Sequence, residues 1–467
     1  MSAHPANVRP HTGSSHGWGL VDARRKEELI RAIAAGRDTA GPLHAELDLT
    51  DRCNVACYFC NQQDTRTKLQ IPLERVVELI DEMAEAGLAS VRLSGGGDPL
   101  HHREILAVLD HFEARGVVLD NLTTNAVSLT PAVARRLVDQ EAREVNVSLN
   151  TVDGADYRRM MQVKPAVFDR VLDNVRHLLA VRGERRLPIV TLQFLLDRRN
   201  AERALEMDDL AREIGADRIV LSAVQQIPDD RLAAADLLDA GDGERLLPVF
   251  TELYRRHSPG DSLDLELNLD VQGLGPMLAA ARRRAGAAPA SPFPIAPSFR
   301  AEDGGCFFAW YSIAITGNGN VYPCCQLIRP KGPVMGNVLE DGAAGVWHGE
   351  SYERLRGEMR EALLDGADRT LDPARFEILD PVCHTPGRCW LKTMYFQWDD
   401  AFYARLHEAL EGARTNRSRV RAARGAAAAV AGRLPWLAPA VDRLRDASRP
   451  LRVWLRHRLG LDLTEAA

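Results

Sequence analysis

The feature that most restricts the fold is a long alternation of strand-like and helix-like segments. Runs with the composition of buried strands cover residues 44–49, 90–95, 117–125, 144–150, 189–196 and 217–224. Amphipathic helical patterns lie between them, over residues 72–87, 103–116, 131–140, 168–182 and 201–215. Strands that alternate with helices predict a parallel α/β sheet, either open and doubly wound or closed as a barrel. Six units are too few for a complete eight-stranded barrel, so we favour a partial (β/α)6 TIM-type barrel.

The remaining segments suggest a division into five parts. These are an N-terminal tail with a short helix (1–43), the barrel (44–272), an Ala-, Pro- and Arg-rich linker (273–302), a small α+β domain (303–400) and an Arg/Ala-rich helical tail (401–467). The small domain contains a hairpin signal, in which the residues 317–320 form the turn. The tail is basic, which is typical of a solvated helix face but would permit weak contact with a partner or an anionic surface.

Composition narrows the possible environments and partners. No apolar run approaches the ~20 residues that a membrane span needs, and the N-terminus lacks the apolar stretch of a secretory signal. We therefore expect a cytoplasmic protein. The formal net charge is −6 and no nucleic-acid recognition motif accompanies the basic tail, so we expect no nucleic-acid partner.

The eight cysteines fall into two groups, which predicts metal ligands in a reducing compartment. The first group has the spacing Cys53-x3-Cys57-x2-Cys60 and follows the first predicted strand, where a barrel places its chemistry. A structural zinc site would need a fourth ligand, and three thiolates would weaken a catalytic zinc as a Lewis acid. A four-iron cluster with three thiolates keeps one iron open, so the spacing favours an iron–sulfur cluster over zinc.

This motif, with Phe59 as the aromatic residue before the last cysteine, resembles the signature of the radical S-adenosylmethionine (SAM) superfamily. The resemblance covers about residues 44–225 and implies a [4Fe-4S] cluster whose open iron is chelated by SAM. It further implies reductive cleavage of SAM to a 5′-deoxyadenosyl radical that abstracts hydrogen from the substrate. An electron donor such as a flavodoxin or a ferredoxin is then expected.

Other strand ends fit the same resemblance. The segment SGGGDP (94–99) is similar to the family's glycine-rich motif, whose backbone holds the amino group of SAM; glycines let the main chain approach a ligand closely. Asp98 stands where Glu is commoner. Polar residues at the ends of the third and fourth strands match family contacts to the ribose and carboxylate of SAM, with ordinary turn capping as the alternative. The expected SAM contacts are Phe59, Gly95, Gly96, Gly97, Asp98, Asn125, Ser148 and Asn150.

The second cysteine group resembles the SPASM and twitch extensions that follow such barrels. The resemblance rests on Gly319-x4-Cys324, preceded by Cys306, and implies one auxiliary [4Fe-4S] cluster. Its expected ligands are Cys306, Cys324, Cys383 and Cys389; a structural zinc with four thiolates is the alternative. Cys325 is left over, although the roles of Cys324 and Cys325 could be exchanged. A spare Cys325 would be a small buried residue or a hydrogen-atom donor to the substrate radical.

Two substrate classes are compatible with these features. The first is a small polar metabolite, such as a sugar, an aminocyclitol or a nucleoside, which an oxidoreductase or epimerase would act on. The alternative is a ribosomal peptide, cross-linked through thioether or C–C bonds or epimerised. Peptide maturases of this family often carry a leader-binding domain, and the 43 residues before the first strand are too few for one. We therefore favour the small molecule, and a non-catalytic metal-binding scaffold is a further alternative.

Overall fold

The computed structural model describes residues 17–60, 62, 66–224, 236–257, 261–269, 273–287, 306–328, 332–365, 399 and 401–415. Within these residues the strands form one ten-stranded sheet with the spatial order β10-β9-β8-β1-β2-β3-β4-β5-β6-β7. The strands are β1 (His44–Leu47), β2 (Ser90–Leu93), β3 (Val118–Thr124), β4 (Glu144–Ser148), β5 (Ile189–Leu196), β6 (Arg218–Ala223), β7 (Asp264–Asn268), β8 (Ser312–Ile315), β9 (Asn320–Tyr322) and β10 (Gly336–Asn337).

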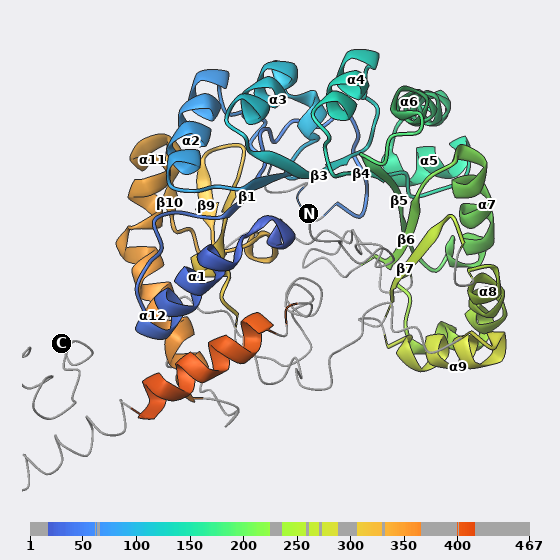
Figure 1. Cartoon of the computed structure of the whole chain (residues 1–467). Coiled ribbons are helices and arrows are strands. Elements are labelled where there is room, and N and C mark those ends of the chain that lie inside the picture. The colour runs from blue at the N-terminus through green and yellow to red at the C-terminus, as the bar shows by residue number, and fades with distance from the viewer. Residues whose placement is uncertain are drawn as a thin grey trace, which may run out of the picture.

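Strands β1 to β7 pair in sequence order and in parallel. Helices follow the strands and cover the convex side of the curved sheet (Figure 1). They are α2 (Leu73–Glu85), α3 (Ile105–Ala114), α4 (Pro131–Asp139), α5 (Gly154–Met161), α6 (Ala166–Arg182), α7 (Ala204–Ile214), α8 (Gly243–Arg256) and α9 (Gly275–Ala285). The predicted fold class, a partial α/β barrel, is confirmed.

The apolar stripe of each helix explains this arrangement. In α2, Val76, Leu79, Ile80 and Met83 recur at helical spacing and are all buried. Helix ends carry the expected caps: the Thr130 hydroxyl accepts from the Val133 backbone at the start of α4, where Pro131 fixes the first helical residue. The core therefore lies between the helices and the convex face of the sheet.

Alternate residues of the same strands are polar, and they lie on the opposite, concave face. Near the amino ends of the strands, Glu144 accepts hydrogen bonds from Asn121, Thr191 and Arg218 at 3.1, 2.6 and 3.3 Å. Because this carboxylate is buried, these donors satisfy a charge that would otherwise be costly inside the protein. This network closes one end of the concave face, and the carboxyl ends of the strands lie at the other end.

Strand β8 joins the C-terminal segment to the barrel sheet, because it pairs in parallel with β1 from His44↔Ser312 to Leu47↔Ile315. β8 and β9 form the predicted hairpin. The segment also contains α10 (Phe308–Tyr311), α11 (Val338–Trp347) and α12 (Glu350–Asp365). The Glu82 carboxylate of α2 accepts hydrogen bonds from the Ala343 and Ala344 backbone, which ties α11 to the barrel.

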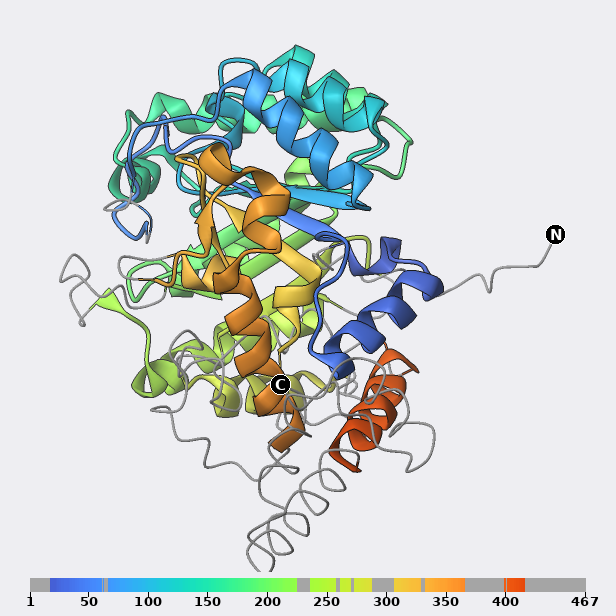
Figure 2. The ribbon, with the colours of Figure 1, turned by 90° about the vertical axis from the view of Figure 1, so that its left-hand side faces the viewer.

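The N-terminal helix α1 (Ala23–Ala35) lies beside the helix of residues 401–415, drawn in orange-red in Figure 2. The Trp18 ring meets the Phe402 ring edge to face at 4.8 Å, and Lys26 forms an ion pair with Asp399 at 2.6 Å. The start and the late part of the chain therefore pack together. No helix in the described part of the chain is both long and apolar enough to cross a membrane.

The pattern analysis missed several elements. Helices α5 and α8 and strand β7 were not predicted, and α9 lies within residues 273–302, which the composition suggested were a linker. The sequence of β7, Asp-Leu-Glu-Leu-Asn, alternates polar and apolar residues as a strand does, and β7 pairs in parallel with β6. The tail beyond residue 415 lies outside the described residues.

Candidate active site

The cysteine loop begins where β1 ends, as predicted, and runs along the C-terminal end of α5. The backbone amides of Ala56 and Tyr58 donate to the carbonyls of Met161 and Met160 at 3.1 and 3.2 Å. Cys57 is buried and Cys53 and Cys60 are half-buried, and within the described residues none of the three forms a disulfide. Burial raises the pKa of Cys53 and, more strongly, that of Cys57. Deprotonation of these thiols therefore requires a compensating positive charge, which a metal centre supplies.

The glycine motif after β2 packs directly against this loop. The Gly97 amide donates to the Thr50 carbonyl, and the Asp98 amide donates to the Arg52 carbonyl, both at 2.9 Å. A Cβ atom built on Gly97 would lie 2.0 Å from the Arg52 carbonyl oxygen, far inside contact distance. The glycine is therefore required by the approach of the chain's own cysteine loop, before any ligand is considered.

Asp98 is buried and its carboxylate receives several donors from the protein. It accepts from the Asn125 amide at 2.7 Å, from the Thr124 hydroxyl at 2.9 Å and from the Leu100 amide at 2.9 Å. The Asn125 side chain in turn donates to the side-chain oxygen Oδ1 of Asn54 at 2.7 Å and lies 3.7 Å from the Cys53 sulfur. Asp98 thus positions Asn125 against the cysteine loop, and a direct contact of either residue with SAM stays a prediction.

Asn150 is engaged by the protein in the way that the capping alternative describes. Its side-chain oxygen accepts from the Leu195 amide at 3.1 Å, and its side-chain nitrogen lies 3.3 Å from the Ser148 carbonyl. Its φ of 67° is a left-handed conformation that Asn tolerates better than most residues. Ser148 is half-buried at the end of β4, and its predicted contact with SAM is untested.

Phe59 lies between the main core and a small second apolar cluster and packs against both. Val224 and Leu237 form the buried part of the second cluster, and Tyr58, Phe59 and Leu195 pack around them. The Tyr58 and Phe59 rings meet edge to face at 5.3 Å. Half-buried apolar side chains next to the cysteine loop are suited to packing against an aromatic ring of a ligand. The sequence analysis identified Phe59 but not its neighbours, which come from the ends of β5 and β6 and from the segment before α8.

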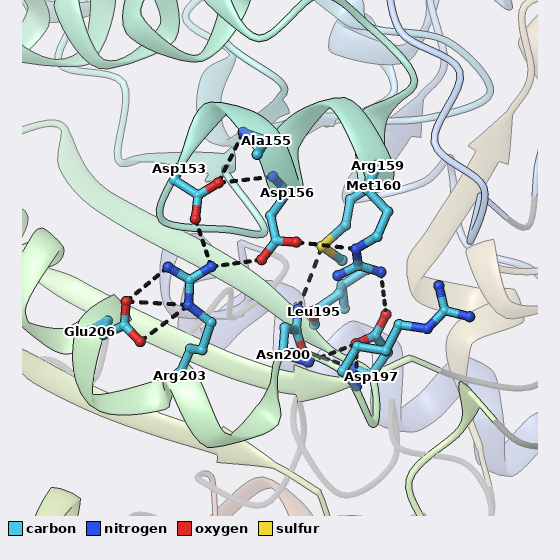
Figure 3. Close-up of polar contacts among 11 residues, drawn as sticks. Asp153, Ala155, Asp156, Arg159, Met160, Leu195, Asp197, Asn200, Arg203 and Glu206 are labelled. Atoms are coloured by element: carbon cyan, nitrogen blue, oxygen red, sulfur yellow. Dashed lines mark hydrogen bonds and ion pairs between the residues drawn. The ribbon is translucent and has the colours of Figure 1, made fainter.

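A network of ion pairs fixes α5, and with it the cysteine loop (Figure 3). Arg203 bridges Asp153 and Asp156 at 2.6 and 2.7 Å. Arg159 binds the fully buried Asp197 at 2.9 Å, and the Tyr58 hydroxyl donates to the same carboxylate. Burial and this neighbouring carboxylate raise the pKa of Tyr58, so its hydroxyl stays a donor. Nothing in the sequence spacing indicated this network, because its members lie up to 139 residues apart.

The two adjacent cysteines of the second group face different elements. Cys325 acts electrostatically on the buried Glu46 carboxylate of β1, and burial raises the pKa of both groups. The Cys324 thiol instead acts electrostatically on Tyr352 of α12. Cys325 is therefore directed toward the barrel and Cys324 toward α12. Cys306 is half-buried, while Cys383 and Cys389 lie outside the described residues.

Asp48, the first residue after β1, accepts a hydrogen bond from the Gly96 amide at 3.0 Å. Burial raises the pKa of Asp48 to about 7, and the hydrogen bond from Gly96 opposes that shift. A second buried carboxyl group thus lies at the junction between β1 and the glycine motif.

The three thiols of the cysteine loop suit a cluster better than a single ion. Among the described residues, no three His, Cys, Asp or Glu side chains lie close enough to share one metal ion. A cubane cluster does not require such proximity, because each thiolate binds a different iron. The donor set, three cysteines on one loop at the carboxyl end of β1, therefore fits the iron–sulfur cluster that the spacing predicted.

Comparison with known families agrees with this geometry. Residues 47–211 match the radical SAM superfamily, and residues 306–371 match SPASM, an iron–sulfur cluster-binding domain. The chain is 26% identical over 324 residues to a PqqA peptide cyclase of Xanthomonas campestris pv. campestris (strain 8004), covering 68% of this chain and 76% of that protein. It is also 26% identical over 188 residues to a probable GTP 3′,8-cyclase of Saccharolobus solfataricus, covering 40% of this chain and 58% of that protein.

Solved structures share the fold. The crystal structure of Streptococcus suis SuiB matches with a TM-score of 0.52 at 18% identity, covering 72% of each chain. SuiB bound to its precursor peptide SuiA matches with a TM-score of 0.52 at 17% identity, covering 71% of each chain.

Proposed function

This chain is a radical SAM enzyme with a SPASM-type iron–sulfur domain, and we propose that its substrate is a ribosomally made peptide, which it cross-links or cyclises. The observation that carries the proposal is the similarity to PqqA peptide cyclases over about two thirds of the chain. The similarity to the GTP cyclase covers a smaller part of the chain. The peptide thus replaces the small metabolite that the short N-terminal segment favoured, because a leader-binding function need not reside in that segment.

The radical SAM domain implies a [4Fe-4S] cluster and SAM, and the SPASM domain implies auxiliary iron–sulfur clusters. When bound, these groups supply the one-electron chemistry that removes a hydrogen atom from the substrate. The thiolates of Cys53, Cys57 and Cys60 would hold the first cluster. Cys306 and Cys324, together with Cys383 and Cys389, would hold one auxiliary cluster.

The protein's own contribution is to orient these groups. The hydrogen bonds between the glycine motif and the cysteine loop fix where the main chain of residues 95–97 meets a ligand. The half-buried face of Phe59, with Leu195 and Val224, would receive the adenine of SAM and exclude water from it. Asn125 would hold the loop beside Cys53 through its bond to Asn54.

The concave face of the sheet offers polar groups to a peptide. Four half-buried residues lie on one face of the sheet according to the register of its parallel strands: Arg92 of β2, Asn146 of β4, Gln193 of β5 and Glu266 of β7. Backbone amides and polar side chains of a peptide need such partners when they are removed from water. An electron donor of the flavodoxin or ferredoxin type would supply the electron.

The proposal is tested with the anaerobically reconstituted full-length chain, SAM, a reductant and short peptides encoded beside its gene. A cross-linked or cyclised product should be lighter than the peptide by the mass of two hydrogen atoms, and mass spectrometry of its fragments should locate the new bond. Release of 5′-deoxyadenosine stimulated by sugars or nucleosides, with every such peptide left unchanged, would contradict a peptide substrate.

A further inference from the structure

We propose that Arg66 is a positioning residue that makes the SAM-cleaving cluster easier to reduce. The inference rests on Cys60 as a ligand of that cluster and is independent of which substrate the enzyme uses. Arg66 was not among the residues that the sequence motifs identified, because it follows the cysteine motif at a spacing with no recognised pattern.

Two contacts place the Arg66 guanidinium at the centre of the site. Its Nη2 atom lies 3.2 Å from the Cys60 sulfur, within reach of an N–H···S hydrogen bond. Its Nε–H donates to the carbonyl oxygen of Gly96. One planar side chain therefore connects the last cysteine of the loop with the middle of the glycine motif. The fork of an arginine can make both bonds at once, which the single ammonium of a lysine does less well.

In the described part of the chain, the positive charge of Arg66 is not paired with a carboxylate, unlike that of several other half-buried arginines. Arg159, Arg203 and Arg212 each form ion pairs with carboxylates at 2.6–3.2 Å. Across the described residues, by contrast, no carboxylate lies within 4.0 Å of Arg66, and its hydrogen bonds go to a sulfur and a carbonyl. A guanidinium is always protonated in a protein, so this positive charge is available to an anionic thiolate.

Reduction of a cluster adds one electron to a centre that already carries anionic thiolates. Hydrogen bonds to the ligand sulfurs and nearby positive charge both favour the reduced form, and both raise the reduction potential. Arg66 supplies both effects through one group. The Coulomb interaction is strengthened because the side chain is half-buried, where the effective dielectric constant is lower than in water.

The test is a redox titration of the full-length reconstituted chain without SAM, followed by electron paramagnetic resonance. The variant in which Cys53, Cys57 and Cys60 are all replaced by Ala identifies, by difference, the signal of the first cluster. In Arg66→Gln, the ratio of reduced to oxidised cluster at a fixed potential should fall about tenfold, a shift of about 59 mV for a one-electron couple. Arg66→Lys keeps the charge but not both bonds, so its ratio should fall by less than that.

Arg52→Gln is the matched control. It removes one positive charge from the same loop, but the Arg52 side chain binds the Lys68 carbonyl and no sulfur, so its midpoint should shift clearly less than that of Arg66→Gln. Iron content is measured for every variant. An Arg66→Gln protein with full iron and the parent midpoint overturns the proposal. If Arg66→Gln does not retain the cluster, the reduction midpoint of Arg66→Lys is used in its place. An unshifted midpoint in Arg66→Lys then overturns the proposal equally. If the parent protein and the triple cysteine variant gave the same paramagnetic resonance signals, the assignment of Cys53, Cys57 and Cys60 as cluster ligands would be refuted instead.

Discussion

Replacing Gly97 with Ala should damage the cysteine loop before any ligand is bound. The added Cβ would lie 2.0 Å from the Arg52 carbonyl oxygen and 2.6 Å from the Arg52 backbone nitrogen, so the neighbour must move by about 1 Å to reach the shortest real contacts near 3.0 Å. That movement breaks or stretches two backbone hydrogen bonds of 2.9 Å, from Gly97 to Thr50 and from Asp98 to Arg52. Two such bonds contribute about 1 kcal/mol each, and overpacking costs about 1–3 kcal/mol more. We expect a loss of about 3–5 kcal/mol in unfolding free energy.

Two measurements check this expectation: the urea midpoint of the anaerobically reconstituted protein, and its iron content. Because the displaced carbonyl belongs to the residue before Cys53, iron bound by the cysteine loop should fall together with stability. Gly357→Ala is the control, since its Cβ would meet nothing within 4 Å inside helix α12. It should raise stability by about 0.5–1 kcal/mol. If Gly97→Ala had the stability and iron content of the parent protein, the packing argument would be refuted. Gly97 would then be needed only to let a ligand approach the main chain.

Three further predictions follow from the site and its surroundings. Replacing all three loop cysteines with Ala should remove about half of the iron, counting two clusters, and abolish release of 5′-deoxyadenosine, measured by chromatography; unchanged release would refute the assignment. Cys324→Ala should lose the auxiliary iron while Cys325→Ala retains it, because Cys325 acts on the Glu46 carboxylate of β1 and Cys324 on Tyr352 of α12. The opposite pattern in iron analysis would exchange their roles. Asp208→Asn should lower stability by about 2 kcal/mol at pH 6 and by progressively less between pH 4 and pH 2 in urea titrations. Burial alone would raise the pKa of Asp208, but its hydrogen bonds to His257 and Arg212 hold that pKa at about 2. The stabilisation is therefore present above the pKa of 3.8 in the unfolded chain, and it is lost as the carboxylate is protonated at lower pH. A stability difference that does not depend on pH would contradict this prediction.

The barrel could be predicted because its information is local. Apart from α5, each strand and longer helix between residues 44 and 224 carries its own periodicity, and the six predicted strands agree with the observed ones to within about two residues. Strand β8 shows the limit of such reasoning. Its residues Ser312–Ile315 were predicted as one strand of a hairpin, and they do form that hairpin with β9. They also pair in parallel with β1, which joins segments more than 260 residues apart. Only the folded chain brings those two edges together.

The site shows the same division between local and long-range information. The cysteine motif identified the loop because its chemistry lies within eight residues, from Cys53 to Cys60. The groups that hold the loop carry no such signature. Tyr58 forms a hydrogen bond with Asp197 at the end of β5, and Arg66 forms one with the Gly96 carbonyl after β2. An arginine or an aspartate in isolation is most often a surface residue. Its role becomes visible when the parallel sheet brings the carboxyl ends of several strands to one edge.

Because of this arrangement, the position of the cysteine loop depends on contacts with several strand ends along the sheet edge. The loop is bonded to the glycine motif after β2, to Asn125 after β3, to α5 after β4 and to Asp197 after β5. Each bond by itself contributes about 1 kcal/mol, but they all restrain the same short segment. Displacement of the segment from one side therefore strains its bonds on the other sides. Substitutions such as Gly97→Ala and Tyr58→Phe, which touch opposite sides of the loop, should thus combine non-additively in a double-mutant cycle, although their side chains share no contact with one another.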